Sequence, residues 1–486
     1  MIDLGESCRR ATASGLARWA AMGVVVFGAA VSLWLNFPGH MSYDSVVQLA
    51  EGRDGAYGLS GHPPVMSWLL GVSDALVPGS AVFVVLDTGL IAGALVSFIM
   101  LGRRVSWLVV IPCAAVVTFP QLLIYPAIVW KDVLFAAAAT AGFACLAQAA
   151  VHWRGPVLRY GLIGTGLTLV TLAAMARQNG VVILPFAAAA IAWISARSRS
   201  GPKAWRGLTH GLGFLVACAA IMLGGSAALT PPKVAPAAAV RGQFGNLQTY
   251  DMVHALVLNP GAELRVLHRR APWFERLLRH DGVAAFSPIR IDSLQPLMEQ
   301  AGVHPDSTDL IAAQWNDLFL RDPWLYLRVR LDAFSWVLLT PSVEDCVLIY
   351  TGVDGPSHEM SDVGLTPRQS VTDVALANYA VAFAPTPVYS HAAYGVLAVV
   401  LLFGLLRRRM ASDIVVAAML CAALAFAGAF LLISIACDYR YLYDLDVATI
   451  AASLYVAATW KDGAELYPRP WRRAAAKRSG LYSEPA

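Results

Sequence analysis

The residues of this sequence that could do chemistry are acidic and basic side chains in short connections between apolar runs. The basic ones are Arg53, Lys131, Arg177 and Arg440. The acidic ones that accompany them are Asp44, Glu51, Asp132 and Asp438. A carboxylate can remove a proton from an attacking hydroxyl group, and fixed cations can stabilise a departing phosphate. The alternative interpretation is that these charges only form ion pairs and anchors at a membrane surface.

Charged residues are scarce in this chain, and their scarcity indicates the class of protein. Of the 486 residues, 57% are hydrophobic and 14% are charged, whereas about 25% are charged in an ordinary soluble domain. This composition excludes a soluble enzyme, a disordered chain and a nucleic-acid-binding module. It predicts several membrane-spanning segments, with membrane lipids as partners and no nucleic acid.

Apolar runs long enough to cross a bilayer, which takes about 20 residues as a helix, recur along the sequence. We predict ten spans, at 19–36, 79–101, 105–121, 132–151, 160–177, 180–196, 207–229, 388–406, 412–436 and 442–460. The shorter run 63–77 follows two prolines and is predicted to be a juxtamembrane helix, because proline favours the first helical turn. The predicted fold class is therefore an all-α polytopic membrane protein.

The remaining basic residues predict the orientation of these spans. Twenty of the 36 Lys and Arg residues fall on one side of the predicted topology, and the positive-inside rule makes that side cytoplasmic. Both termini are thus predicted to be cytoplasmic, in a cell inner (plasma) membrane. Twelve further cations lie in 230–387, which we predict to be a long outer segment. The four cations named above remain, and all four fall on the outer side.

This topology divides the chain into four predicted parts. They are a transmembrane module at 1–229 with its first outer loop at 37–78, a mainly helical extracytoplasmic domain at 230–387, C-terminal transmembrane helices at 388–460, and a basic cytoplasmic tail at 461–486. Within the outer domain, the stretch 315–339 indicates two helices broken at Asp322-Pro323. The second of them is amphipathic and is predicted to lie on the membrane surface.

The first outer loop carries the most informative motif. Tyr43 and Asp44 follow the first span, and His62-Pro63-Pro64 comes about 17 residues later. Asp44 is also well placed to cap the helix that the next residues predict, and the two roles are compatible. Between these motifs, a solvated turn is predicted to hold Glu51, Arg53 and Asp54.

Three further motifs each stand at the outer end of a predicted span. Trp130-Lys131-Asp132 opens the fourth span, and Arg177 lies in the turn Arg177-Gln178-Asn179-Gly180 between the fifth and sixth spans. The last motif, Tyr439-Arg440-Tyr441, opens the last span. Because all of these ends face the same side of the predicted topology, the motifs are expected to lie near one another.

Taken in this order, the four motifs resemble those of the GT-C superfamily of membrane glycosyltransferases. The resemblance is to the protein O-mannosyltransferases and the lipid A aminoarabinose transferases, the family 39-like group. It covers roughly residues 1–230 and one motif of the last spans, and it leaves the outer domain unmatched. The chain departs from the family where prolines usually follow the Arg-Tyr pair, because Asp444 and Asp446 stand there.

The resemblance implies a GT-C-like fold and a role for each motif residue. It implies that Asp44 is the catalytic base, supported in the first loop by Tyr43 and His62. The donor phosphate is then bound by Lys131, Arg177 and Arg440. Asp132 orients the donor or holds a divalent metal ion, and no other cofactor is implied.

The implied reaction is an inverting transfer on the outer face of the membrane. The donor is a sugar linked to polyprenyl phosphate, and the acceptor is a lipid, glycan or protein. The sequence contains no convincing nucleotide-binding loop, which agrees with a lipid-linked donor. The sugar and the acceptor are not specified by the sequence.

The seven cysteines form no CxxC motif and no cluster with histidine. This pattern predicts neither a zinc site nor a disulfide framework. A bridge between Cys346 and Cys437 remains conceivable.

Two other functions compete with glycosyl transfer. A transporter or flippase of a lipid-linked glycan predicts broken helices at the bilayer midplane and internal symmetry, and Asp87 inside a span would then relay protons. A non-catalytic accessory protein would use its outer domain to bind an envelope partner. Geometry discriminates among them, since the enzyme requires that Asp44, Asp132 and Arg177 lie close together, facing a cavity open to lipid.

Overall fold

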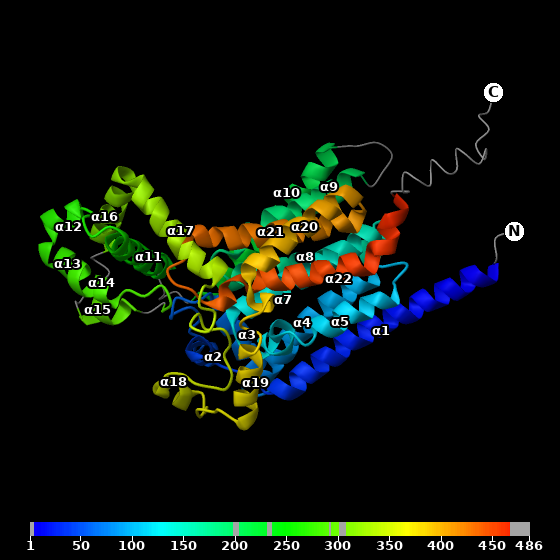
Figure 1. Cartoon of the computed structure of the whole chain (residues 1–486), viewed down its shortest axis with the longest axis horizontal. Coiled ribbons are helices and arrows are strands. Elements are labelled where there is room, and N and C mark those ends of the chain that lie inside the picture. The colour runs from blue at the N-terminus through cyan, green and yellow to red at the C-terminus, as the bar shows by residue number, and fades with distance from the viewer. Residues whose placement is uncertain (1–3, 198–203, 231–235, 291–292, 301–307, 467–486) are drawn as a thin grey trace.

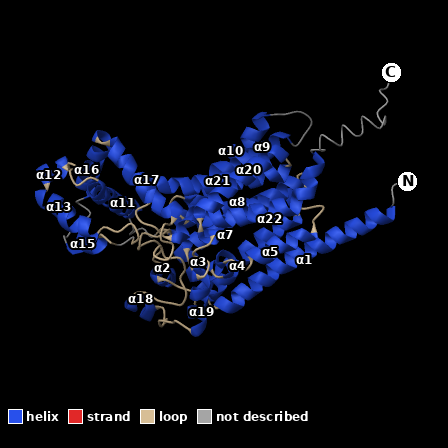
Figure 2. Cartoon of the chain, viewed as in Figure 1, coloured by secondary structure: helices blue, strands red, loops and turns tan. Residues whose placement is uncertain are grey.

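The protein is helical throughout the part of the chain that its computed structural model describes. This part comprises residues 4–197, 204–230, 236–290, 293–300 and 308–466. Figure 2 shows helices joined by loops, and within the described residues the only β-type pairings are isolated bridges between single residues. The prediction of an all-α fold is confirmed.

Eight helices in the described ranges are long and apolar enough to cross a membrane. They are α1 (Leu4–Asn36), α4 (Ala81–Met100), α7 (Lys131–Val151), α8 (Pro156–Ala176), α9 (Leu184–Arg197) with the short η3 (Gly180–Ile183) before it, α10 (Ala204–Leu229), α20 (His391–Arg408) and α21 (Ala411–Ile433). A multi-pass membrane protein is therefore confirmed. Two of the ten predicted spans differ from expectation.

The predicted span 105–121 is not one straight helix. Its first part, Trp107–Val116, comprises η1 (Trp107–Val109) and α5 (Val110–Val116), and it is bent by 80° from the segment Pro120–Ala127 that follows. Proline cannot donate a backbone hydrogen bond, and it forces the residue before it out of the helical region. Phe119 is accordingly extended, and Pro120 starts a new short helix, α6 (Pro120–Leu123).

The predicted span 442–460 corresponds to α22 (Tyr443–Leu466), which is not among the eight apolar helices. Asp444 and Asp446 lie in its first turn and make its start polar. The helix nevertheless runs inside the bundle, where it packs against α20, α7, α4 and α21. Because protein rather than lipid surrounds α22, its acidic residues need not face hydrocarbon.

The helix bundle has two ends, or poles, and one of them, the basic pole, carries Arg18 and Arg103. At the basic pole, Arg18 donates to the carbonyl of Gly102 at 3.4 Å, and the amide of Arg103 donates to the carboxylate of Asp462 at 2.8 Å. At the other end of α1, the Asn36 side chain donates to the carbonyl of Leu123 at 2.8 Å. In Figure 1 the start of α1 and the end of α22 lie at the right, and the short helices α2 (Tyr43–Asp54) and α3 (Pro64–Leu76) lie toward the opposite pole.

The predicted outer segment 230–387 contributes to two hydrophobic cores. The first part of this segment has a hydrophobic core of its own, with Met252, Phe274 and Val329 at its centre. The helices of this part are α11 (Pro236–Leu258), α12 (Arg265–Arg270), α13 (Pro272–Leu277), α14 (Val283–Ala285), α15 (Gln295–Gln300), α16 (Thr308–Arg321) and the start of α17 (Pro323–Leu339). The rest, with α18 (Ser357–Asp362) and α19 (Val371–Val381), packs onto the core of the bundle.

Helix α17 connects the two cores. The break predicted before it is present, since the Asp322 side chain caps α17 by accepting from the amide of Leu325 at 3.0 Å. Farther along, Arg330 is buried and pairs with Asp251 of α11 at 2.6 Å. The same guanidinium donates to the carbonyls of Leu432 and Ser434 at the end of α21. The second core is thereby fixed to the bundle just before the segment that leads to α22.

A disulfide joins Cys346 to Cys437, the pairing that the sequence left open. The two residues are 91 positions apart, and the amide of Tyr439 donates to the carbonyl of Cys346 at 2.9 Å. The bridge therefore attaches the loop after α17 to the segment that carries Asp438 and Arg440.

Removing this disulfide should lower the stability of the protein. Closing a loop of this length stabilises the folded state by about 4 to 5 kcal/mol in the chain-entropy model. We expect Cys346→Ser to lower the midpoint of thermal unfolding in detergent, as reduction of the wild type should. Cys145 is free, so Cys145→Ser is the control and should leave the midpoint nearly unchanged. Equal midpoints for wild type and Cys346→Ser would contradict the stabilising role.

Candidate functional site

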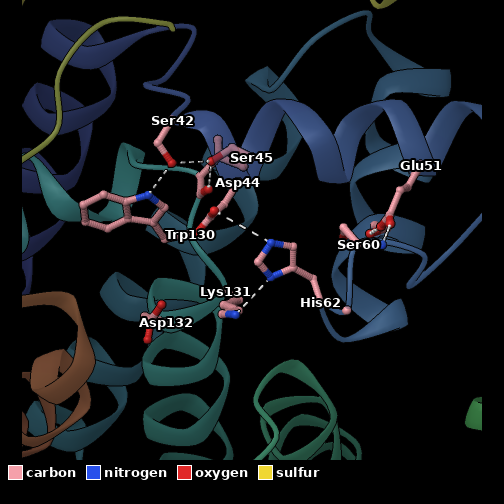
Figure 3. Close-up of polar contacts among 12 residues, drawn as sticks. Ser42, Asp44, Ser45, Glu51, Ser60, His62, Trp130, Lys131 and Asp132 are labelled. Atoms are coloured by element: carbon pink, nitrogen blue, oxygen red, sulfur yellow. Dashed lines mark hydrogen bonds and ion pairs between the residues drawn. The ribbon is translucent and has the colours of Figure 1, made fainter. Parts of the chain in front are cut away.

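Asp44 lies in the first turn of α2, where the positive end of the helix favours a carboxylate. Its carboxylate does not close the helix end as the sequence allowed, because Ser42 occupies the cap position. The Asp44 oxygens instead approach two basic groups. Oδ2 lies 3.1 Å from Nη1 of Arg440, and Oδ1 lies 3.8 Å from Nε2 of His62. Figure 3 shows Asp44 and the His62 ring pointing toward each other.

His62 stands between Asp44 and Lys131 (Figure 3). The Lys131 ammonium lies 3.1 Å from Nδ1 of His62, and a protonated lysine can only donate. Nδ1 then accepts, which leaves the ring proton on Nε2, the nitrogen that faces Asp44. Burial lowers the pKa of His62 to about 4, and the nearby positive charge of Lys131 acts in the same direction. His62 is therefore uncharged at neutral pH.

The loop that carries His62 is held by Glu51, a residue that sequence reasoning placed in a solvated turn. That prediction is wrong for Glu51, whose side chain is buried. Its carboxylate accepts from the hydroxyl of Ser67 at 2.7 Å, the amide of Ser60 at 2.5 Å and the amide of Gly58 at 3.3 Å. Glu51 is thus a positioning residue for the turn before His62.

Arg53 serves the local structure. Its guanidinium makes two hydrogen bonds to the Asp74 carboxylate, at 2.8 and 2.7 Å. This bidentate contact joins the end of α2 to the end of α3, and Asp74 also accepts from the amide of Gly79 at 2.7 Å. Of the four cations that the sequence singled out, Arg53 is the one that forms a purely structural ion pair.

Asp132 and Arg177 form a buried ion pair between α7 and α8. Asp132 lies in the first turn of α7, and Arg177 stands at the C-terminal end of α8. Each charge is therefore at the helix end whose dipole favours it. The Arg177 guanidinium also lies 5.4 Å from the ring centre of Phe430 and 5.5 Å from that of Tyr441. This aromatic surround excludes water from the pair and strengthens its electrostatic interaction.

Arg440 joins the two halves of the cluster. It lies in the single helical turn η7 (Tyr439–Leu442) between α21 and α22. Besides Asp44, its guanidinium contacts Asp438 at 2.8 Å and approaches Asp132 at 3.9 Å. It also lies over the Trp130 ring, 4.9 Å from the ring centre, and the Trp130 indole donates to the hydroxyl of Ser42 at 2.9 Å.

These neighbours set the protonation of Asp44. Burial on its own raises the pKa of the carboxyl, but the positive charge of Arg440, with smaller effects of His62 and Lys131, outweighs it. The pKa of Asp44 is therefore held below its ordinary value of 3.8. Asp44 is an ionised carboxylate at neutral pH, which is the state that a general base requires.

The cluster balances its charges. Its carboxylates are Asp44, Asp132 and Asp438, and its cations are Lys131, Arg177 and Arg440. Both arginines are in direct contact with carboxylates, whereas Lys131 contacts the uncharged His62. Lys131 is thus the basic group of the cluster that contacts no carboxylate, and an incoming anion would stabilise its charged form.

The residues around Asp132 do not fit a divalent metal ion. Arg177 pairs with one oxygen of Asp132, and Arg440 faces the other. Hard cations need several oxygen ligands, and no group of three or more His, Cys, Asp or Glu side chains in the described ranges is placed to hold a metal. Asp132 instead orients the two guanidinium groups.

An apolar pocket of about 260 Å³ adjoins the charged cluster. It lies between the turn before α3, the C-terminal end of α8 and the peripheral helix α10. His62 and Arg177 form the part of its wall that belongs to the cluster. Most of the remaining wall is apolar and includes Met175, Val181, Met222 and Leu229. The pocket is therefore suited to an apolar chain that ends in a charged group.

The structure brings six of the seven site residues named from the sequence into one contact network. Tyr43 is the exception, because its side chain is 62% exposed and takes no part in the contacts described above. Sequence reasoning did not identify Trp130 or Tyr441 as parts of the site, although both lie in the motifs that it used. An aromatic residue next to an unusual cation is the signal that could have found them.

Comparison with known proteins identifies no family for this chain. No family model, no curated protein and no solved structure matches the chain. A functional assignment has to be argued from the chemistry of the cluster and its pocket.

Proposed function

We propose that this protein is a membrane glycosyltransferase that moves a sugar from a polyprenyl-phosphate donor to an acceptor on the extracytoplasmic face. One observation carries the proposal. An ionised carboxylate, Asp44, lies among three cations at one pole of a membrane bundle, beside an apolar pocket. The GT-C-like fold and the family relationship belong to the same proposal, which the motif order supports.

The proposed reaction is a single inverting displacement. The acceptor hydroxyl oxygen attacks the anomeric carbon of the sugar, and the bond from that carbon to the phosphate oxygen breaks. Asp44 takes the proton of the hydroxyl group as the new glycosidic bond forms. The polyprenyl phosphate leaves with the bonding electron pair as an anion, and the fixed cations stabilise its negative charge.

The charge balance favours a donor with one phosphate group. A sugar phosphodiester brings a single negative charge to the site. Lys131 supplies a cation that is not in contact with a carboxylate, and Arg177 lines the pocket in which the phosphate end would lie. A diphosphate-linked donor would bring at least one more negative charge than the single uncontacted basic group, Lys131, can balance, which is costly in a buried site.

The apolar pocket supports the lipid nature of the donor. Its wall of methionine and aliphatic side chains offers nonpolar surface to an isoprenoid chain, and burying such surface is favourable by about 25 cal/mol per Å². Helix α10, which forms one side, buries few of its own residues and therefore stands at the edge of the bundle, where lipid has access.

We further propose that the pole with Asp44 faces outward from an inner (plasma) membrane, with both termini cytoplasmic. The basic residues at the opposite pole support this orientation through the positive-inside rule. The Cys346–Cys437 bridge lies next to the site, and disulfides persist in oxidising compartments outside the cytoplasm.

A transporter of a lipid-linked glycan is the second candidate, because the broken segment Trp107–Val116 and Pro120–Ala127 is a feature that transporters share. The part after the break lies at the site pole, however. The carbonyl of Ala127 accepts from the amide of His40 at 2.9 Å, just beyond the end of α1. A transport site at the midplane is therefore less well supported than a reaction at the pole. The accessory-protein alternative is weakened because Asp44, Asp132 and Arg177 share one network.

A reconstituted transfer assay tests the proposal. Purified protein in nanodiscs is incubated with a panel of labelled polyprenyl-phosphate sugars and an envelope extract as acceptor. We expect loss of one donor, release of polyprenyl phosphate and appearance of label in a glycan, lipid or protein. Mass analysis of envelopes with and without the protein should show the same product. Translocation of a labelled glycan without cleavage of the donor would support the transporter instead.

The kcat/KM of transfer should not fall when the pH is lowered slightly from neutral. Because cations hold the pKa of Asp44 below 3.8, the base stays ionised as the pH falls toward that value. We expect kcat/KM to remain flat between about pH 5 and pH 7 and to fall only at lower pH, when Asp44 takes up a proton. A pH titration of initial rates measures this, and an acid limb centred between pH 6 and 7 would assign the base to another group.

A further inference from the structure

A second pocket, of about 220 Å³, lies in the part of the protein that has its own core. It is formed by α12 and α16 and is lined by four arginines. They are Arg265, Arg269, Arg270 and Arg321. The remaining lining includes Val266, Ala313 and a single carboxylate, Asp317. Four guanidinium groups around one small cavity form a site for an anion, because their planar forks match the oxygens of phosphate.

The frame of this pocket is rigid. The buried side chain of Gln314 in α16 accepts from the amides of Val266 and Leu267 in the first turn of α12, at 2.8 and 3.1 Å. These bonds satisfy two backbone donors at the start of α12 and fix that helix to α16. The backbone positions that carry the arginines are therefore fixed relative to each other before any ligand arrives, which lowers the entropic cost of binding.

Two of the four arginines are partly neutralised by acidic neighbours. Arg265 pairs with Glu263, and Arg321 pairs with Asp317 at 2.7 Å. Arg269 and Arg270 have no carboxylate partner among the described residues. The pocket and its neighbours thus carry a net charge of about +2, which matches a phosphate monoester, whose charge is about −1.5 to −2 at pH 7.

The pocket stands away from the bundle. In Figure 1, α12 and α16 lie at the far left, at the end of the molecule opposite to the start of α1 and the end of α22. A bilayer around the horizontal bundle helices would not reach this end. The ligand is accordingly expected in the aqueous phase outside the membrane rather than in the lipid headgroup layer.

We propose that the pocket between α12 and α16 binds the phosphate monoester group of a soluble molecule. The proposal does not rest on the transfer reaction, because the pocket is separate from Asp44 and its cations. It assigns a binding role to the first part of the outer segment, which the proposed reaction does not otherwise use.

Binding of a sugar phosphate to the full-length protein in neutral phosphatidylcholine nanodiscs tests this inference. The probe is glucose 6-phosphate, with glucose and glucuronic acid as comparisons. We expect saturable binding that weakens as salt is added, and weaker binding of glucuronic acid and glucose. The double variant Arg269→Gln/Arg270→Gln should weaken glucose 6-phosphate binding at least about tenfold, since it removes two charge-assisted contacts. Arg328 is exposed on α17 and outside the pocket, so Arg328→Gln should bind like the wild type.

A second experiment tests whether a membrane lipid, rather than a soluble molecule, supplies the phosphate monoester. Nanodiscs that contain phosphatidic acid present a phosphate monoester in the headgroup layer. If phosphatidic acid binds to the wild type but not to the Arg269→Gln/Arg270→Gln variant, while soluble glucose 6-phosphate binds to neither, the soluble-ligand proposal is overturned. Equal binding by the wild type and the double variant also overturns it, and these results leave the transfer assay unaffected.

Discussion

Replacement of Asp44 by asparagine is expected to reduce transfer by about 10²- to 10⁴-fold, the usual contribution of a general base. The amide has nearly the same shape as the carboxylate, but it cannot take the proton of the acceptor hydroxyl. The measured quantity is the rate of label transfer from the polyprenyl-phosphate sugar. Donor binding should change much less than the rate, because Lys131 and the pocket are left in place.

A matched control lies on the same helix. Asp54 is exposed at the end of α2 and is not among the residues of the cluster, so Asp54→Asn should transfer at the wild-type rate. Both variants should elute from size exclusion and unfold thermally like the wild type. A folded Asp44→Asn protein with undiminished activity would remove Asp44 as the base.

The part of the site that the sequence predicted follows from membrane topology. Asp44, Lys131 and Arg177 are far apart along the chain, but each stands at a span end on the same predicted side. Because spans cross the membrane in alternating directions, alternate connections must meet at one pole. Side chains at one pole can then contact one another, because the distances across a bundle are short. His62 lies between Asp44 and Lys131, with one ring nitrogen 3.8 Å from the Asp44 carboxylate and the other 3.1 Å from the Lys131 ammonium.

The parts that the sequence did not predict depend on tertiary contacts. Glu51 is a residue type that is usually solvated, and only the fold shows that Gly58, Ser60 and Ser67 bring three donors to it. Helix α22 carries Asp444 and Asp446 without cost in lipid because other helices surround it. Neither effect leaves a periodic signal in the sequence.

The outer segment was the least predictable region. No motif indicated that Arg330 would be buried against Asp251. An arginine in an otherwise apolar helix is usually expected to extend its charged end to the membrane surface. Likewise, the spacing of Cys346 and Cys437 does not determine a pairing. Both contacts converge on the segment 432–440, so the geometry around Arg440 depends on residues that sequence reasoning had no basis to connect.

Arg440→Gln is expected to be the second most damaging substitution. Arg440 is the cation in contact with both Asp44 and Asp438, and its loss leaves these carboxylates facing each other without the charge between them. Removing a positioned group that stabilises developing negative charge costs about 10²- to 10³-fold in rate. Arg440→Lys should retain part of the activity, because the charge remains but the planar fork that reaches two carboxylates is lost.

The pH profile separates this electrostatic role from a purely structural one. Arg440 makes the largest contribution of the neighbouring cations that lower the pKa of Asp44, so the pKa of Asp44 should rise in Arg440→Gln. The residual activity of that variant should then fall at a higher pH than in the wild type, as Asp44 takes up its proton earlier. Arg53→Gln is the control, since Arg53 pairs with Asp74 outside the cluster, and it should leave the acid limb in place. An unshifted limb in folded Arg440→Gln protein would show that Arg440 does not hold Asp44 in its ionised form.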